Sequence, residues 1–117
     1  MPTIRRAITV PAGGVNDNAL AGSPFEFVGQ AAQVEIAAVR ETAPAGVGTI
    51  EVTFGPQVQL EPGPLATEQA AGLGPLLPDN ILVSDIAAPG DRLRVGLRET
   101  GGAADMDVVL LVRVEPV

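Results

Sequence analysis

The sequence predicts an all-β fold, and three observations carry this prediction. Short apolar runs alternate with polar residues at a period of two, which is the pattern of half-buried strands. Valine and isoleucine number 15 and six, and β-branched residues favour strands. The 14 glycines and 11 prolines stand between the apolar runs rather than in long tracts, which is typical of a domain with many turns.

The first expected element is Thr3–Val10, whose alternation is imperfect because Arg6 interrupts an otherwise apolar face. We interpret it as a strand or as part of an extended N-terminal arm over residues 1–15. A Pro- and Gly-rich segment, residues 11–14, ends it. The apolar residues of that face are Ile4, Ile8 and Val10.

Four short strands are expected next: Phe25–Val28, Gln33–Arg40, Thr49–Phe54 and Gln57–Leu60. The second and third of these alternate cleanly, and the Gly- and Pro-rich segment Thr42–Gly48 lies between them. This arrangement predicts an antiparallel hairpin with a long tip. Gly55 and Pro56, which precede the fourth strand, predict a bend or bulge near a sheet edge.

Residues 61–79 are irregular and contain Pro or Gly at seven positions. We expect a long crossover loop here, in which Leu65–Ala71 has the composition for about two helical turns. Three strands follow: Ile81–Ile86, Asp91–Glu99 and Met106–Glu115. The last strand contains five consecutive apolar residues, Val108–Val112, which predict that it is covered on both faces.

Eight short strands in 117 residues fit one domain over residues 1–117, because a chain of this length is too short for two independent cores. The arrangement that accommodates them best is an eight-stranded antiparallel β-sandwich of Greek-key or jelly-roll type. A small β-barrel is the alternative fold.

Missing residue types exclude several classes of function. The chain has no Cys, His, Trp or Tyr, which excludes disulfides, thiolate metal sites and every catalytic mechanism that needs histidine. We therefore expect no enzyme activity, no cofactor and no metal. Polar residues that calcium would accept, Asn16, Asp17 and Asn18 or Asp105 and Asp107, are interpreted as turn formers, since no twelve-residue calcium loop is present.

The charge balance also limits the partners. The formal net charge of −7, from seven arginines and 14 carboxylates, disfavours nucleic acid. No apolar run approaches the 18 residues of a membrane-spanning helix. The apolar stretch after Arg5 and Arg6 is too short for an export signal. We expect no nucleic-acid or membrane binding, and synthesis in a cytoplasm.

Contact with other proteins is the function that remains. Leu, Ile, Val, Met and Phe number 37, and many lie in predicted loops, which predicts burial against other copies of the chain. Arg92, Arg94 and Arg98 share one face of a strand. They can bind an anion, contact an acidic partner, or pair across strands with Glu35 or Glu51. The candidate interface residues are Arg5, Arg6, Val10, Leu73, Leu76, Leu77, Arg92, Arg94 and Arg98.

A small all-β chain without Cys or His, with Arg but no Lys and with Gly/Pro-rich loops, resembles the decoration (cement) and minor capsid proteins of bacteriophages. The resemblance implies a non-enzymatic homo-oligomer, with a trimer favoured, on the outside of an icosahedral capsid. The partner would be the major capsid protein, and Met1–Val15 would be the terminal arm that makes the contact. The alternative is a binding or adhesion module of a fibre or appendage, such as a carbohydrate-binding domain.

Overall fold

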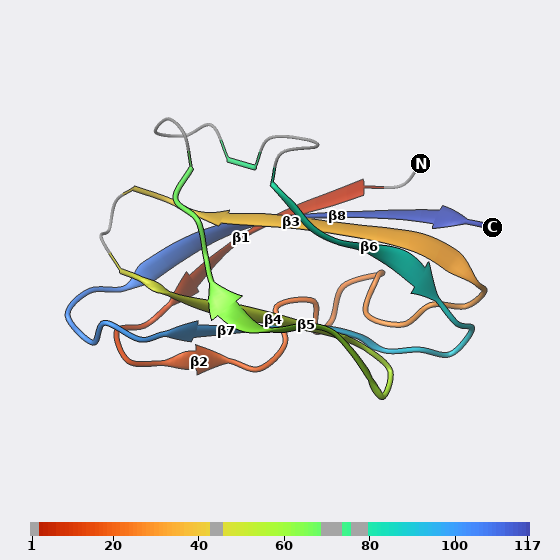
Figure 1. Ribbon diagram of the computed structural model, residues 1–117, viewed down its shortest axis with the longest axis horizontal. Coiled ribbons are helices and arrows are strands. Elements are labelled where there is room, and N and C mark those ends of the chain that lie inside the picture. Colours follow the sequence, from red (N-terminus) through yellow and green to blue (C-terminus); the bar gives the residue numbers. More distant parts are fainter. Residues whose placement is uncertain (1–2, 43–45, 69–73, 76–79) are drawn as a thin grey trace.

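A computed structural model describes residues 3–42, 46–68, 74–75 and 80–117. They form eight strands in two antiparallel sheets of four, and these residues contain no helix. Figure 1 shows the two sheets as stacked layers. The strands are β1 (Thr3–Val10), β2 (Val15–Asn16), β3 (Ala32–Arg40), β4 (Gly48–Phe54), β5 (Gln57–Pro64), β6 (Ile81–Ala87), β7 (Leu93–Glu99) and β8 (Met106–Pro116).

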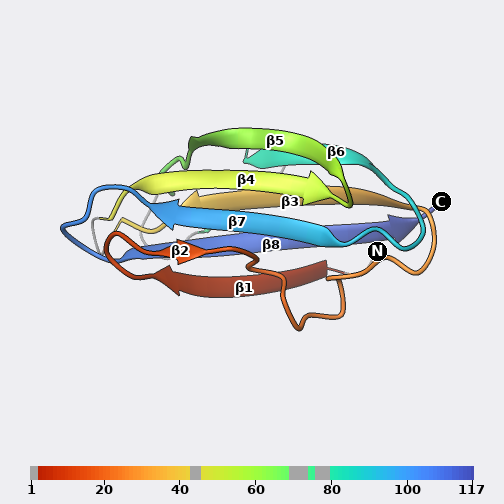
Figure 2. The ribbon, with the colours of Figure 1, turned by 90° about the horizontal axis from the view of Figure 1, so that it is seen from below.

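The strand orders are β1-β8-β3-β6 in one sheet and β2-β7-β4-β5 in the other. Every neighbouring pair is antiparallel. Figure 2 shows β5 beside β6 along one side of the molecule and β1 beside β2 along the opposite side. No ladder of the described residues joins the two sheets. The all-β prediction and the number of strands are therefore confirmed, whereas the alternative of a closed barrel is wrong. The predicted hairpin of Gln33–Arg40 with Thr49–Phe54 is also wrong, because β3 and β4 lie in different sheets.

The hydrophobic core lies between the two layers. Along β4, buried side chains alternate with half-buried ones, because successive residues of a strand point to opposite faces. The core is mostly aliphatic, and Phe54 is its only fully buried ring. Each buried aliphatic side chain contributes about 1.5–3 kcal/mol relative to exposure. Both sheets contribute, with Val34, Ile36, Leu110 and Val112 from one and Ile50, Val52, Val95 and Leu97 from the other.

The middle of the outer face of the β1-β8-β3-β6 sheet is buried, whereas outward residues of the edge strands, such as Arg5 of β1 and Ile86 of β6, are exposed. Val39 and Val109 point away from the core, yet they are 0% and 3% exposed. The segment after β5 crosses to this sheet, where the Glu68 N–H donates to the Arg40 carbonyl (2.9 Å), and Gly74 lies against Val109. The prediction that β8 is covered on both faces is confirmed. Leu65–Glu68 is not helical, and the rest of the expected helix lies outside the described residues.

The structure decides two interpretations of the first 30 residues. Residues 3–10 form a strand, which was one of the two alternatives, and not an extended arm, because β1 pairs with β8 along its whole length and Ile4 and Ile8 pack against the core. Phe25–Val28 is not a strand and makes a single isolated bridge, between Phe27 and Arg92. The strand that pairs with β7 at the edge of the sheet is instead β2, which has only two residues.

The edge strands carry features that oppose pairing with another chain. In β1, Arg6 occupies an inward-facing position. In β6, Leu82 is an extra residue opposite β3, and the Asp85 carboxylate accepts the N–H of Ile86 (2.7 Å). β5 contains two prolines and two register shifts. Bulges, prolines, inward charges and short strands all protect sheet edges, so contact through a face is favoured over strand addition.

Candidate functional site

The outer face of the β2-β7-β4-β5 sheet is the candidate site, and we call it the arginine face. Two arginines lie on the outward side of β7, and a third lies directly before this strand. The neighbouring strands and loops supply carboxylates. The described part of the crossover lies on the opposite sheet, against Arg40 and Val109, and not on this face. The arginine face comprises Val15, Asp17, Glu26, Phe27, Thr49, Glu51, Val58, Pro62, Arg92, Arg94, Gly96 and Arg98.

Arg92 is held in place at one end of the arginine face. Its Nε donates to the Glu26 carboxylate at 2.8 Å, and its guanidinium lies 6.0 Å from the centre of the Phe27 ring. The backbone N–H of Gly22 and, after it, the Arg92 guanidinium lower the pKa of Glu26. Arg92 is therefore already neutralised, and it supports a ring that is 60% exposed.

Arg94 is neutralised as well, by the cross-strand carboxylate of Glu51 at 3.0 Å. The pair lies across Gly96, where an added Cβ would come within 2.8 Å of the Glu51 carboxylate. This contact confirms the predicted pairing of a β7 arginine with Glu51. The other acid predicted for this role, Glu35, lies on the opposite sheet and pairs with Arg113 at 3.6 Å.

Arg98 differs from the other two arginines. It is exposed, and no described carboxylate lies within 4 Å of it. Its neighbours in register are the uncharged residues Val15 and Thr49. A hollow of about 230 Å³ lies beside it and extends to Asp17 and Pro62. Arg98 is thus a guanidinium whose donors are available to a partner.

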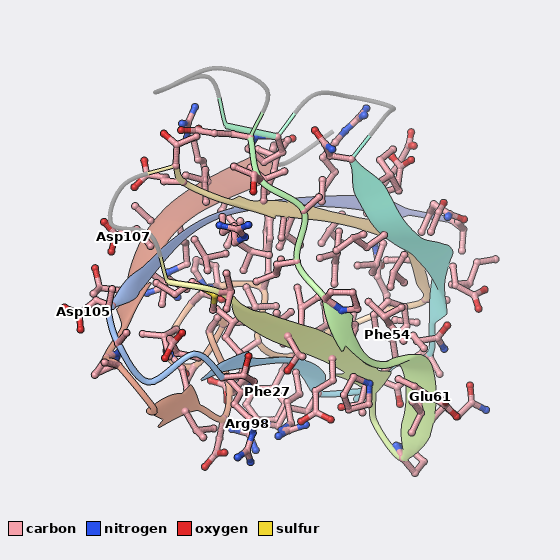
Figure 3. The ribbon with its side chains drawn as sticks, turned by 60° about the vertical axis from the view of Figure 1, so that its left-hand side comes forward. Phe27, Phe54, Glu61, Arg98, Asp105 and Asp107 are labelled. Atoms are coloured by element: carbon pink, nitrogen blue, oxygen red, sulfur yellow. The ribbon has the colours of Figure 1, made fainter. Side chains whose placement is uncertain are left out.

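Apolar side chains stand around these charges. Val15, Phe27 and Val58 are 46%, 60% and 62% exposed, and Figure 3 shows Phe27 and Arg98 on the same side of the molecule. Exposed apolar groups beside polar ones are found at contact surfaces, where aromatic and arginine side chains are enriched. The three arginines and three carboxylates of the arginine face balance, so the formal net charge of −7 is carried by the rest of the chain.

The other predicted interface residues do not join the arginine face. Arg5 is exposed on the opposite sheet, beside Gly74. Arg6 points inward, and its Nη1 is enclosed without a hydrogen-bond partner. Val10 is 0% exposed in the core, so its assignment to an interface is wrong. It shares the inward face of β1 with Ile4 and Ile8. The three predicted leucines, Leu73, Leu76 and Leu77, lie outside the described residues.

A second polar centre, which the sequence did not predict, lies at the end of the molecule where β7 meets β8. Glu99 is 2% exposed, and its carboxylate accepts four backbone N–H groups at 2.6–3.1 Å. These bonds, those from Gly13 and Gly102 first, lower the pKa of Glu99 to about 2. The donors come from three loops and are Gly13, Val47, Gly101 and Gly102.

The sequence contains a signal for this centre. Glu99 follows Leu93, Val95 and Leu97 at a period of two, which assigns an acid to the inward face of β7. Buried carboxylates need hydrogen-bond donors, and glycines cluster in the loops that meet here. The glycines also permit close packing, since a Cβ on Gly48 would overlap the carbonyl oxygen of Arg98.

The polar turn residues satisfy the backbone. The Asn18 side chain accepts the N–H groups of Leu20 (3.0 Å) and Val95 (3.2 Å), and Asp105 accepts the N–H of Ala12 (3.0 Å). The interpretation as turn formers is confirmed for Asn16 and Asn18, which each accept an N–H two residues on. It is wrong for Asp107, which lies in β8 and accepts the hydroxyl of Thr9. Among the described residues, no group of three or more acids could hold a metal ion.

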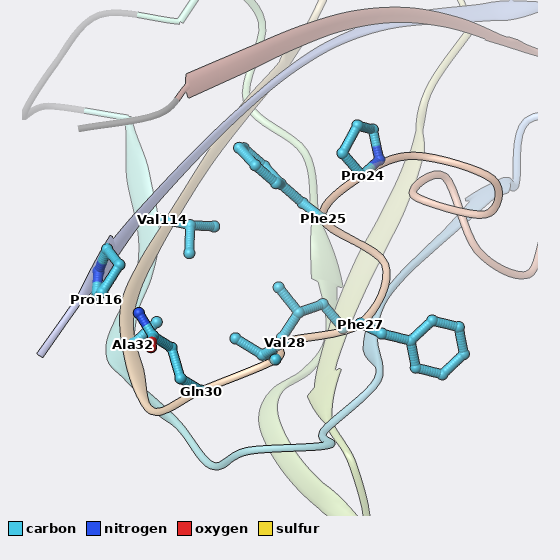
Figure 4. Close-up of a pocket in the computed structure, with 10 residues that line it drawn as sticks. Pro24, Phe25, Phe27, Val28, Gln30, Ala32, Val114 and Pro116 are labelled. Carbon is cyan, nitrogen blue, oxygen red and sulfur yellow. The ribbon is translucent and has the colours of Figure 1, made fainter.

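An apolar hollow of about 200 Å³ lies near the C-terminal end of β8. Figure 4 shows Phe25, Val28 and Val114 around it, whereas the Phe27 ring points away. Its lining offers few polar atoms that could fix a ligand in one orientation, so we rank it below the arginine face.

Searches of protein-family models, curated proteins and solved structures gave no match to this chain. The described residues include no helix long and apolar enough to cross a membrane.

Proposed function

We propose that this chain is a non-enzymatic structural protein that acts by docking, namely an oligomeric decoration protein bound to the outside of an icosahedral phage capsid. Its body would be an eight-stranded β-sandwich of jelly-roll type. Its partners would be other copies of itself and the major capsid protein. The resemblance in composition motivates the proposal, and the geometry of the faces supports it.

The order of the strands supports the jelly roll. The first strand pairs with the eighth, the second with the seventh, the third with the sixth and the fourth with the fifth. Such nested pairing results when one long hairpin is rolled into two sheets. Jelly rolls of this kind occur in viral capsid and lectin domains, although a fold alone does not establish a function.

The observation that carries the proposal is the inequality of the two outer faces. The described part of the crossover lies against the middle of one face, at Arg40 and Val109, while the arginine face combines exposed apolar groups with balanced charges. Protected edges favour contact through a face rather than through strand addition. A face of this composition is suited to a protein surface, since aromatic and arginine side chains are enriched where proteins bind each other.

A decoration protein needs a second surface for the shell, and the Glu99 end of the molecule could supply it. The backbone at Gly13, Val47, Gly101 and Gly102 is held there by one carboxylate, so little conformational entropy of these residues would be lost on binding. Weak contacts repeated over a capsid lattice then add through avidity. This mechanism requires no titrating or catalytic group.

The test is co-expression with the major capsid protein of the same genome. Shells are purified by sedimentation, and the number of bound copies per capsid subunit is measured by quantitative mass spectrometry. We expect a fixed ratio that withstands washing, and a higher temperature of shell disassembly. Absence from the shells would refute the proposal. Binding to glycans in place of shells would instead support the adhesion module.

A further inference from the structure

We propose that the arginine face binds a second copy of this chain around a two-fold axis near Gly96, with Arg98 of each copy pairing with Asp17 of the other. The inference rests on the proposed function and deepens it, because it assigns the self-association surface. A face-to-face pair has two members, so it replaces the expected trimer by a dimer.

Two arginines and two carboxylates surround Gly96 on the arginine face. Arg94 and Arg98 lie two residues to either side of it on β7. Glu51 lies opposite Gly96 on β4. Asp17 is the residue directly after β2, on the other side of β7, and it lines the same hollow as Glu51 and Arg98. Two positive groups thus lie along the strand and two negative groups lie across it. Gly96 contributes no side chain to the centre.

This cross of charges is self-complementary. Consider a two-fold axis that lies in the plane of the face at about 45° to β7. Rotation about this axis places the line through Arg94 and Arg98 of one copy over the line through Glu51 and Asp17 of the other. The two sheets would then cross at close to a right angle, which is one of the two common modes of sheet packing. A two-fold contact of this kind uses the same patch on both copies.

Two of these four charged groups already form an ion pair, and the other two do not. Arg94 and Glu51 hold each other at 3.0 Å. Neither Arg98 nor Asp17 has an ion-pair partner among the described residues, and both are exposed. They have opposite signs and line the same hollow. Two reciprocal Arg98–Asp17 pairs would therefore satisfy both groups without breaking an existing contact.

The apolar surroundings support the same contact, and the available area limits its strength. Val15 is the neighbour of Arg98 in register, and its removal from water would strengthen the adjacent ion pair by lowering the local dielectric constant. The molecule measures 41 × 25 × 22 Å, with the strands along the longest dimension. Because the two sheets would cross, they would overlap over about 22 × 22 Å, roughly 480 Å². This is less than the roughly 800 Å² per partner of a standard interface, so we expect a weak dimer.

The experiment measures the mass of the full chain by light scattering and sedimentation equilibrium at 0.1 M salt. The protomer has a mass of 11.9 kDa, and we expect a dimer. Arg98→Glu and Asp17→Arg should each weaken self-association about tenfold or more, because each creates two like-charge contacts. An equimolar mixture of these two variants should form a heterodimer, since both reciprocal contacts become attractive again.

Arg5→Glu is the matched control, because it makes the same charge change on the opposite sheet and should leave the dimer intact. Far-UV circular dichroism checks that each variant is folded. A monomer or trimer for the wild type, a stable Arg98→Glu homodimer, or a mixture that does not associate would each overturn the inference. Shell binding is measured separately, so a chain that binds shells without forming this dimer contradicts only the inference. A dimer that does not bind shells contradicts only the proposed function.

Discussion

Replacing Glu99 by glutamine tests how one carboxylate orders an end of the molecule. The two carboxylate oxygens share four backbone N–H donors. Glutamine keeps one acceptor oxygen but turns an NH₂ group toward the donors of the other. We expect Glu99→Gln to unfold at a lower urea concentration at pH 7, with faster amide exchange at Gly13, Val47, Gly101 and Gly102.

The size of the effect on proton binding follows from the pKa. Glu99 has a pKa of about 2 in the folded chain against an ordinary value of 4.5. Since the folded pKa is the lower one, the ionised carboxylate stabilises the fold fully above pH 4.5, and this contribution is lost as the pH falls through about 2. Near pH 3, unfolding of the wild type should therefore take up about one proton more than unfolding of Glu99→Gln.

Urea unfolding between pH 7 and pH 2 measures this difference, followed by far-UV circular dichroism because the chain has no Trp or Tyr. Carbon NMR of the side-chain carboxyl gives the pKa directly. Glu26, whose pKa is also lowered, is present in both proteins and cancels in the comparison. A Glu99 pKa near 4.5, or a stability difference that stays constant down to pH 2, would refute the reasoning.

Three further substitutions test the packing by urea unfolding at pH 7. Arg6→Leu should raise the free energy of unfolding by about 1 kcal/mol, because an enclosed nitrogen without an acceptor is removed; a decrease would mean that the guanidinium stabilises the edge. Gly48→Ala should lower it by about 1–3 kcal/mol, since a Cβ there overlaps the Arg98 carbonyl, and wild-type stability would show that β4 and β7 can move apart at this end. Phe54→Ala should cost about 3–5 kcal/mol as a cavity opens in the core; a loss below 1 kcal/mol would contradict the burial.

The alternation of β-branched and polar residues was sufficient to predict most strands, because a sheet with one face on the core imposes a period of two. It failed where a strand was too short to alternate. β2 is the dipeptide Val15–Asn16, and the turn hydrogen bonds of Asn18, rather than any apolar pattern, position it. Phe25–Val28 has the apolar composition of a strand, but Phe25 and Val28 pack against the core from a loop.

The candidate site was predictable only in part. The spacing of Arg92, Arg94 and Arg98 indicates a shared face, and the pairing with Glu51 follows from cross-strand chemistry. The arrangement around Glu99 brings together loops that are up to 89 residues apart in the sequence, and no local pattern encodes that meeting. Asp17 lies beside Arg98 only because β2 pairs with β7. The arrangement of these charges around Gly96 therefore could not be predicted from the spacing of residues in the sequence.

The proposed dimer must form between two bodies that each carry a formal net charge of −7. Their mutual repulsion acts over the width of the molecule and is screened within about 10 Å at 0.1 M salt. The Arg98–Asp17 pairs act over a few ångströms and are screened much less. Self-association should therefore be weak at very low salt, strongest near 0.1 M and weaker again toward 1 M. The association constant of a dimer held only by apolar contacts would rise steadily with salt. The salt dependence therefore distinguishes a dimer held by the Arg98–Asp17 pairs from nonspecific association.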